Sequence, residues 1–386
     1  MSKEITGALF KQMILHGAAA ITAQKQAIND LNVFPVPDGD TGTNMSMTIA
    51  TAAAEMGKKS FRTVGEAANA TANALLRGAR GNSGVILSLL FRGLSKALKG
   101  METADAAAFA AAMQEGVAAA YKAVMKPKEG TMLTVARMMA EAVTKEANEG
   151  ANLYKLIDVM IDEGERALLL TPELLPVLKE AGVVDSGGKG LVTILRGFKM
   201  VIDGEEVDEY VPAPQQNTAE ITGNEEGADL EALDDIEFGY CTEFFIIHLD
   251  ESFSEADLDK LREKLMKIGD SVVVAHDSDF IKIHVHSNCP GKILQLALRL
   301  GEIDRIKIEN MREQNRELLA NMKKNEKENA LVAVSISDGI DEVYKAIGVN
   351  NLISGGQTMN PSIDSITKAI RRANARNVFV LPNNSN

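Results

Sequence analysis

The stretch N-V-F-P-V-P-D-G-D-T-G-T-N-M, residues 32–45, sets two carboxylates on a rigid turn directly before a helix. Its two prolines fix the backbone φ angle and remove N–H donors, which holds the segment extended. Gly39 allows a sharp turn between Asp38 and Asp40. Carboxylates with this spacing are typical of Mg²⁺ sites that also use phosphate oxygens. The following T-G-T-N opens a helix whose free N–H groups suit a phosphate. On this motif alone, a proline-rich turn with an ordinary helix cap is an equal alternative.

Three further glycine-bearing turns each lead into a helix. Their sequences are G-A-R-G-N-S-G (78–84), K-P-K-E-G-T-M-L-T (126–134) and V-V-D-S-G-G-K-G (183–190). The first of them offers Asn82 and Ser83 as donors and Arg80 as a nearby cation. Four such turns at one end of a helical barrel would form a nucleotide site. Because the P-loop pattern G-x-x-x-x-G-K-[ST] occurs nowhere in the chain, that site would be of a different kind.

The composition restricts the classes of partner. The chain has 386 residues, enough for two or three domains, and a net charge of −13. Nucleic acid and anionic membranes attract a basic face, so the acidic balance argues against both. A magnesium nucleotide stays compatible, since local donors can hold it. Two cysteines fit a reducing compartment, and the first residues lack the features of a signal peptide, so a cytoplasmic location is expected.

Changes of pattern divide the chain into segments. Residues 1–203 are rich in alanine with apolar residues at helical spacing, which predicts one all-α domain. Residues 204–235 form an acidic linker. Residues 236–312 follow the order βαββαβ, a ferredoxin-like α+β pattern. A charged connecting helix at 313–329 leads to βαβαβ at 330–386, the start of a parallel α/β sheet. Because the sequence ends directly after a buried-type strand, this last domain is expected to be incomplete.

A cysteine and two histidines form a second candidate site. Alternation in F-I-K-I-H-V-H-S, residues 280–287, places Lys282, His284 and His286 on one strand face and the apolar residues on the other. The first and third strands of a ferredoxin-like sheet are neighbours, which would bring Cys241 close. These ligand types suit Zn²⁺ with an open fourth position. The alternative is a polar sheet face used for association.

The motifs together resemble the nucleotide-binding subunit of dihydroxyacetone kinases and, more closely, the catalytic subunit of bacterial fatty acid kinases. The resemblance extends through G-Y-C-T-E, H-V-H-S-N-C-P-G-K, E-N-M-R-E-Q and I-S-G-G-Q-T-M-N-P-S, in order along nearly the whole chain. It implies a DhaL-like barrel of antiparallel helices that holds ATP and two Mg²⁺ at one end. It also implies a middle domain and the beginning of a DegV-like or DhaK-like carboxyl-terminal domain.

The resemblance assigns site residues motif by motif. Asp38, Asp40 and Arg80 are the expected catalytic residues. Asp38 and Asp40 match the Mg²⁺-binding acids, and Asn32 or Asp30 stands in place of a further upstream acid. The nucleotide contacts are expected at Thr43, Asn44, Asn82, Ser83, Gly84, Thr131, Met132, Asp185, Ser186 and Gly187. Cys241, His284 and His286 fall in its Y-C-T-E and H-V-H motifs, as candidate Zn²⁺ ligands.

The implied reaction is ATP-dependent phosphorylation of a fatty acid carboxylate, which a separate DegV-like fatty-acid-binding protein presents. The product is an acyl phosphate for phospholipid synthesis. A carboxylate is already ionised at neutral pH, so no general base is needed. In agreement, no histidine lies near the first motif in the sequence, and His16 falls on an apolar helix. The alternatives are a kinase subunit for a small ketone of the dihydroxyacetone type, or a nucleotide-binding scaffold without turnover. A homodimer through an exposed face of the middle sheet is a further expectation.

Overall fold

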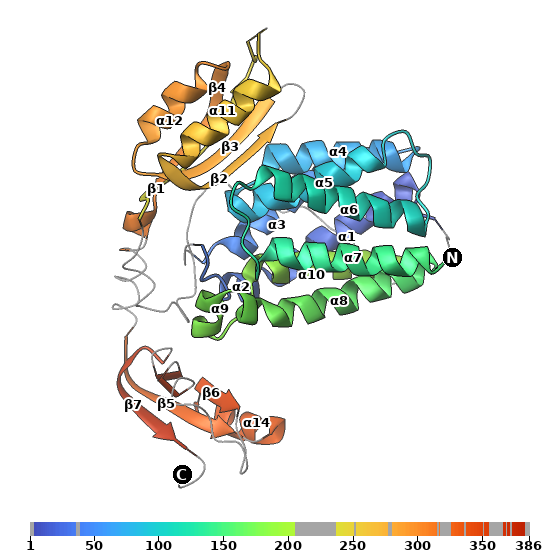
Figure 1. The fold of residues 1–386 in the computed structure, drawn as a ribbon. Helices are drawn as coiled ribbons and strands as arrows, with labels where there is room; N and C mark the ends of the chain where they lie inside the picture. Colours follow the sequence, from blue (N-terminus) through green and yellow to red (C-terminus); the bar gives the residue numbers. More distant parts are fainter. Residues whose placement is uncertain are drawn as a thin grey trace.

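The computed structural model describes most of the chain. The described residues are 4–35, 39–204, 237–250, 252–276, 280–314, 316, 326–335, 337–349, 351–354, 366–367, 369–370 and 373–382. Asp38 and nearly all of the expected acidic linker lie outside these residues. The described chain forms a helical unit, a four-stranded sheet with two helices, and a three-stranded sheet (Figure 1). No described helix is long and apolar enough to cross a membrane.

The helical unit confirms the all-α prediction for the described part of residues 1–203. Its helices are α1 Gly7–Ala23, α2 Lys25–Asn29, α3 Thr41–Gly57, α4 Val64–Gly78, α5 Gly81–Ala97, α6 Ala106–Ala123, α7 Met132–Asn148, α8 Leu153–Leu174, α9 Pro176–Ala181 and α10 Ser186–Asp203. From α3 to α8 each helix packs on the next, α8 packs on α10, and α1 joins α10 to α3. The eight long helices therefore close into a ring.

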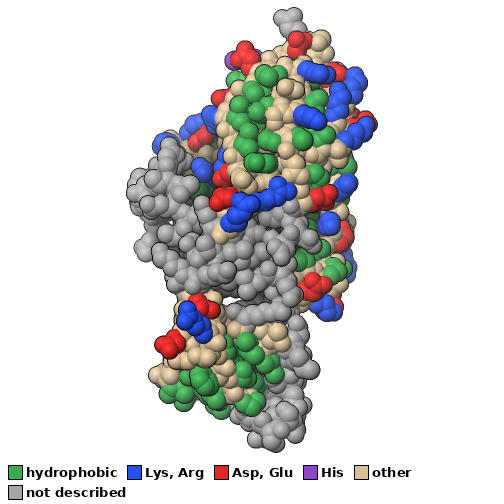
Figure 2. All heavy atoms as spheres, turned by 90° about the vertical axis from the view of Figure 1, so that its left-hand side faces the viewer, with side chains coloured by type: hydrophobic (Ala, Val, Ile, Leu, Met, Phe, Trp, Pro, Cys, Tyr) green, Lys and Arg blue, Asp and Glu red, His purple; other side chains and the backbone are tan. Residues whose placement is uncertain are grey.

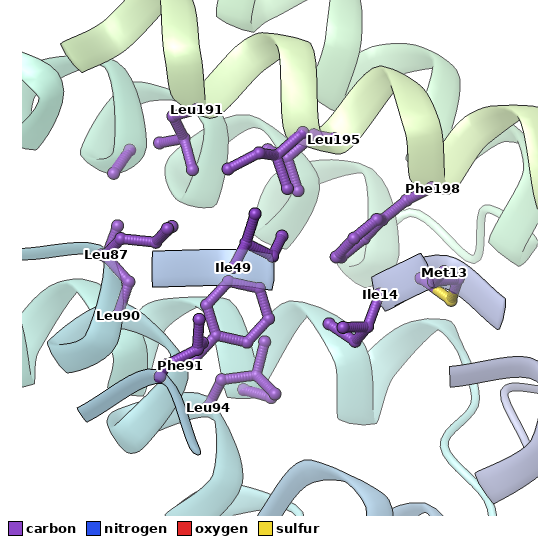
Figure 3. Packing of buried hydrophobic residues seen from close by; sticks show 14 of the residues in the cluster. Met13, Ile14, Ile49, Leu87, Leu90, Phe91, Leu94, Leu191, Leu195 and Phe198 are labelled. Atoms are coloured by element: carbon purple, nitrogen blue, oxygen red, sulfur yellow. The ribbon is translucent and has the colours of Figure 1, made fainter. Parts of the chain in front are cut away.

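Large apolar side chains fill the interior of this ring. Figure 3 shows Ile49 from α3, Phe91 from α5 and Phe198 from α10 directed toward one another. The rings of Phe91 and Phe198 meet edge to face with centroids 6.3 Å apart. Small residues allow close helix contacts elsewhere, since a Cβ atom on Gly93 would lie 2.2 Å from the backbone oxygen of Glu115 on α6. This rigid core holds the helix ends, and the turns between them, in place.

The middle unit follows the expected element order. Its elements are β1 Tyr240–Ile247, α11 Glu255–Met266, β2 Gly269–His276, β3 Phe280–Ser287, α12 Pro290–Ala297 and β4 Glu302–Asn310. The sheet order is β2-β3-β1-β4, and neighbouring strands are antiparallel. The expected pairing of the first and third strands is confirmed. Cys289 is the N-cap residue of α12 and contributes nothing to the sheet.

The two faces of the middle sheet have different neighbours. Ile281, Ile283 and Val285 pack against α11 and α12, as the alternation predicts. The other face lies against the helical unit, where β2 contacts α5 and α6 (Figure 1). Val273 and Ala275 of β2 join the hydrophobic core of the helical unit. The expectation of an exposed polar face is therefore wrong, because this apolar contact covers the face within the chain. A homodimer stays a prediction and would need another surface.

The last unit is a small parallel sheet, as predicted. It contains β5 Lys327–Ser335, α14 Asp338–Ala346, β6 Asn351–Ser354 and β7 Ala375–Leu381, in the strand order β6-β5-β7. The connecting helix predicted to reach residue 329 is too long, since Lys327 already pairs with Ala375 in the sheet. The second expected helix lies largely outside the described residues. Figure 2 shows hydrophobic side chains gathered on the surface of this unit, where Ile347 and Phe379 are exposed.

Candidate functional site

A pocket lies between the helical unit and the middle sheet, at the amino-terminal ends of α3 and α5. The helical unit lines it with Asn32, Pro35, Asp40, Thr41, Asn44, Gly81, Asn82 and Ser83. The middle unit lines it with Cys241, Glu243, His284, His286, Lys307, Glu309, Met311 and Gln314. Carboxylates, amides, imidazoles and an ammonium group dominate this lining, so the pocket suits a charged ligand. A second hollow, lined by residues such as Asp250 and Lys260, contains none of the predicted site residues.

The first turn supplies Asp40 and Asn44 to the pocket. Asp40 precedes the first residue of α3, and its side chain does not cap that helix. Asn32 accepts a hydrogen bond from the Thr41 hydroxyl at 2.9 Å, which anchors the strand before the turn to the start of α3. Thr43 faces away, since it exchanges hydrogen bonds of 3.0 Å with Asn29 on α2. Thr43 therefore holds α2 and α3 together outside the described lining of the pocket.

The second turn brings the start of α5 against the start of α3. Gly81 has a φ angle of +57°, and a Cβ atom placed on it would lie 2.5 Å from the side-chain nitrogen of Asn44. Gly84 approaches Thr48 of α3 equally closely. The Oδ1 atom of Asn82 is buried and has no hydrogen-bond partner among the described residues. Arg80 is exposed and does not line the pocket, so its catalytic role stays a prediction.

The third and fourth turns meet behind the pocket wall. Ser186 is the one that reaches the first turn, donating to Thr41 at 3.2 Å. Asp185 accepts backbone hydrogen bonds from Gly188, at 2.6 Å, and from Met132. Gly187 packs on Met132, and Thr131 donates to the carbonyl oxygen of Lys128. All four predicted turns therefore converge, but the last two support the described pocket instead of lining it.

Asp185 predicts a pH-dependent stability. Burial raises the pKa of its carboxyl from 3.8 to about 6, although the amides of Gly188 and Met132 oppose the shift. The folded chain therefore binds this proton more tightly than the unfolded chain, so the shift lowers stability as pH rises from about 4 to about 6. The loss amounts to about 3 kcal/mol and persists at higher pH. Asp185→Asn removes it. Urea unfolding of both proteins from pH 4 to pH 7 tests this, and a constant difference between them would contradict it.

The Cys241 cluster occupies the opposite wall of the pocket. Cys241 pairs with His286 across β1 and β3, and Glu243 pairs with His284. The Nδ1 atom of His284 lies 2.7 Å from Glu243 Oε1 and 3.9 Å from Cys241 Sγ. The Nε2 atoms of His284 and His286 are 3.2 Å apart. The structure therefore brings together the three residues that the sequence proposed as Zn²⁺ ligands.

Charges within this cluster are strongly coupled. Burial by itself would lower the pKa of His284, but the sulfur of Cys241 and the carboxylate of Glu243 raise it well above its usual value. Burial and the positive charge of His284 together lower the pKa of His286. Burial works against the charge of Glu243, but the hydrogen bond and charge of His284 keep the pKa of that carboxyl low. Without a bound ion, Glu243 is an anion, His284 a cation and His286 neutral.

Two hydrogen bonds attach the cluster to the second turn. Glu243 Oε1 accepts a hydrogen bond of 2.8 Å from the backbone N–H of Gly81. The ammonium group of Lys282 donates to the carbonyl oxygen of Ala79, and burial lowers the pKa of Lys282 to about 8. The sequence prediction placed no histidine near the first motif. In space this is wrong, because the docked sheet puts His284 and His286 into the same pocket as Asp40.

Sequence reasoning missed several pocket residues from the middle unit. Glu243 ends the quoted motif G-Y-C-T-E and shares a strand face with Cys241, so the same alternation rule could have found it. Lys307 and Glu309 lie on β4 and form an ion pair of 2.7 Å at the pocket. They carried no signal, because an alternating charged strand usually faces solvent.

Comparison with known proteins agrees with this architecture. Residues 35–200 match the DAK2 domain, residues 237–318 the middle domain of FakA-like fatty acid kinase proteins, and residues 330–386 the carboxyl-terminal domain of the same proteins. Protein YloV of Bacillus subtilis (strain 168) is 44% identical over 393 residues, which cover 100% of this chain and 71% of YloV. Uncharacterized protein SSP1546 of Staphylococcus saprophyticus is 41% identical over 399 residues, with the same coverage.

One solved structure is more distantly similar. The native dihydroxyacetone kinase of C. freundii matches 52% of this chain and 36% of its own, with 18% sequence identity and a TM-score of 0.38, which is too low to support an inference. The DAK2 domain and the composite pocket define a protein of a kinase family. More specifically, the chain belongs to the FakA-like family of fatty acid kinase proteins.

Proposed function

We propose that this chain is the catalytic subunit of a fatty acid kinase. It transfers the γ-phosphoryl group of ATP to the carboxylate of a fatty acid, and the acyl phosphate product serves phospholipid synthesis. The observation that carries this proposal is the composite pocket, in which Asp40, Asn44 and Asn82 at two helix starts face the middle-sheet cluster. The three fatty acid kinase and DAK2 domain matches supply the substrate class.

The helical wall of the pocket fits a magnesium nucleotide. Asp40 and Asn32 offer oxygen ligands of the kind Mg²⁺ prefers, and Asp38 would add a second carboxylate. The buried Oδ1 atom of Asn82 has no described partner, as expected of an atom that awaits a ligand. The amide groups at the starts of α3 and α5 suit the phosphates, and Asn44 and Ser83 add side-chain donors. When bound, Mg²⁺ would neutralise the charge on the phosphates.

The reaction needs orientation more than proton transfer. An oxygen of the acyl carboxylate attacks the γ-phosphorus, the bond to the β–γ bridging oxygen breaks, and ADP leaves with the bonding electron pair. No proton has to move at neutral pH. The residues of the pocket hold the two reactants in line, exclude water and compensate negative charge. On the sheet wall, Lys307 and the cationic His284 supply the positive charge that attracts the acceptor carboxylate.

A separate protein presents the acyl chain in this proposal. The described lining of the pocket is mostly polar, with Pro35 and Met311 among its few apolar members, so it offers no surface for a long hydrocarbon. A DegV-like fatty-acid-binding protein would bring only the carboxylate into the pocket. The fold assignments are consistent with this role. The closed helix ring supports a DhaL-like barrel, and the strand order β2-β3-β1-β4 supports a ferredoxin-like middle domain.

The test is ATP turnover with defined acceptors. The chain is incubated with Mg-ATP and a fatty-acid-loaded DegV-like protein, and ADP and hydroxylamine-trapped acyl phosphate are measured. We expect both products with the loaded partner and neither with the empty partner. Turnover with dihydroxyacetone and no partner would support the small-ketone alternative. Nucleotide binding without turnover under every condition would support the scaffold.

A further inference from the structure

The two buried histidines of the pocket share an unusual arrangement. Their Nε2 atoms face each other at 3.2 Å. Each outer nitrogen faces a carboxylate, since His284 Nδ1 lies 2.7 Å from Glu243 and His286 Nδ1 lies 3.6 Å from Asp270. Histidines that bind a metal ion usually donate the other ring N–H to a carboxylate, which fixes the tautomer and orients the ring. Both imidazoles are thus directed to present Nε2 lone pairs to the same point.

The spacing of the donor atoms matches a tetrahedral ion. Zinc–nitrogen bonds of about 2.0–2.1 Å at the tetrahedral angle separate two nitrogen ligands by about 3.3 Å. The observed separation of 3.2 Å fits that value. A sulfur atom of Cys241 completes three donors, all within 4.8 Å of one another. His284 and His286 are 1% and 6% exposed, so water cannot satisfy their inner nitrogens freely.

We propose that Cys241, His284 and His286 hold a zinc-class divalent ion whose fourth position opens into the kinase pocket, with Glu243 as its positioning residue. The three ligands line the same pocket as Asp40 and Asn82, so an oxygen ligand in the pocket can reach the open position. This site is distinct from the expected Mg²⁺ site, because soft sulfur and imidazole ligands select a different metal from carboxylate and amide oxygens.

Glu243 gives this ion a connection to the nucleotide side of the pocket. The same Oε1 atom accepts from His284 Nδ1 and from the backbone N–H of Gly81 at the start of α5. Holding His284 in its ligand tautomer therefore also holds the sheet against the second turn. This inference rests on the cluster alone and does not depend on which acceptor the kinase phosphorylates.

Cobalt is the probe for this site, because tetrahedral Co²⁺ reports its ligands by absorption. The full chain is stripped with a chelator and titrated with Co²⁺, and Zn²⁺ is then added in competition. We expect one Co²⁺ per chain, with visible bands of a tetrahedral site and a thiolate charge-transfer band that Zn²⁺ abolishes. Cys241→Ser should remove the charge-transfer band. Cys289→Ser, which changes the N-cap residue of α12, should retain it.

The positioning role has its own variant pair. Glu243→Gln should weaken Co²⁺ binding by about 10-fold to 100-fold, the usual cost of losing such a carboxylate. Glu309→Gln changes another carboxylate of the pocket, one that pairs with Lys307, and should leave the affinity unchanged. Melting curves confirm that each variant is folded.

Two results would overturn the proposal. One is a folded parent chain that binds neither Co²⁺ nor Zn²⁺, which would make the facing imidazoles a pair that shares one proton. The other is a charge-transfer band lost equally in Cys289→Ser and Cys241→Ser. Calorimetric titration of Mg-ATP into the same samples separates this outcome from a failure of the kinase assignment, since nucleotide binding by the metal-free chain needs no thiol ligand.

Discussion

Asp40→Ala abolishes measurable Mg-ATP binding and leaves the helical unit folded. Asp40 lines the pocket directly before α3, where a carboxylate can bind Mg²⁺ together with phosphate oxygens. Its side chain does not cap the helix, so its removal costs little stability. Loss of one carboxylate ligand removes several kcal/mol of charge compensation, and we expect the affinity to fall at least about 100-fold. Isothermal titration of Mg-ATP into parent and variant measures this, with a melting curve for each.

Asp30→Ala is the matched control for that result. Asp30 is the other acid near the first turn, but it is exposed and accepts a hydrogen bond from Gln26 on α2. It does not line the pocket, whereas Asn32 does. The structure therefore favours Asn32 over Asp30 as the additional ligand, and Asp30→Ala should bind Mg-ATP like the parent. Parent-like affinity in Asp40→Ala would refute the Mg²⁺ assignment.

Gly81→Ala should have the second-largest effect, a loss of nucleotide affinity of at least about tenfold together with a lower melting temperature. The added Cβ atom would lie 2.5 Å from the side-chain nitrogen of Asn44, so Asn44 has to leave its place in the pocket. The φ angle of +57° adds about 1–2 kcal/mol of backbone strain in any residue other than glycine. Movement of this turn also weakens the hydrogen bond that the Gly81 N–H donates to Glu243.

Gly100→Ala separates the steric effect from backbone strain. Gly100 has a φ angle of +80°, and nothing lies within 4 Å of a Cβ atom built on it. It therefore carries the strain of about 1–2 kcal/mol without displacing any pocket residue. We expect a lower melting temperature and unchanged Mg-ATP affinity, measured by the same two methods. Equal losses of affinity in both glycine variants would show that general destabilisation, and not the position of Asn44, limits binding.

Local rules were sufficient for the elements and for parts of each site. Alanine-rich helical periodicity predicted the helical unit, and the glycine-bearing turns identified the starts of α3, α5 and α10. Alternation along β3 placed His284 and His286 on one face. These features depend on residues a few positions apart, so the sequence carries them directly. Thr43 and Arg80 show the limit, since their motifs were found but only the fold shows which atoms face the pocket.

The sequence by itself determined which residues share a helix start or a strand face, because helical and strand periodicity are local properties of the chain. Only the tertiary structure decided what covers the polar face of the middle sheet. Burial of Val273 and Ala275 in the core of the helical unit docks that sheet, and Glu243 then meets Gly81, 162 residues earlier in the chain. No local rule encodes such a contact, since periodicity selects a face but the long-range packing of apolar surface selects its neighbour. That packing turned two separate motifs into one pocket.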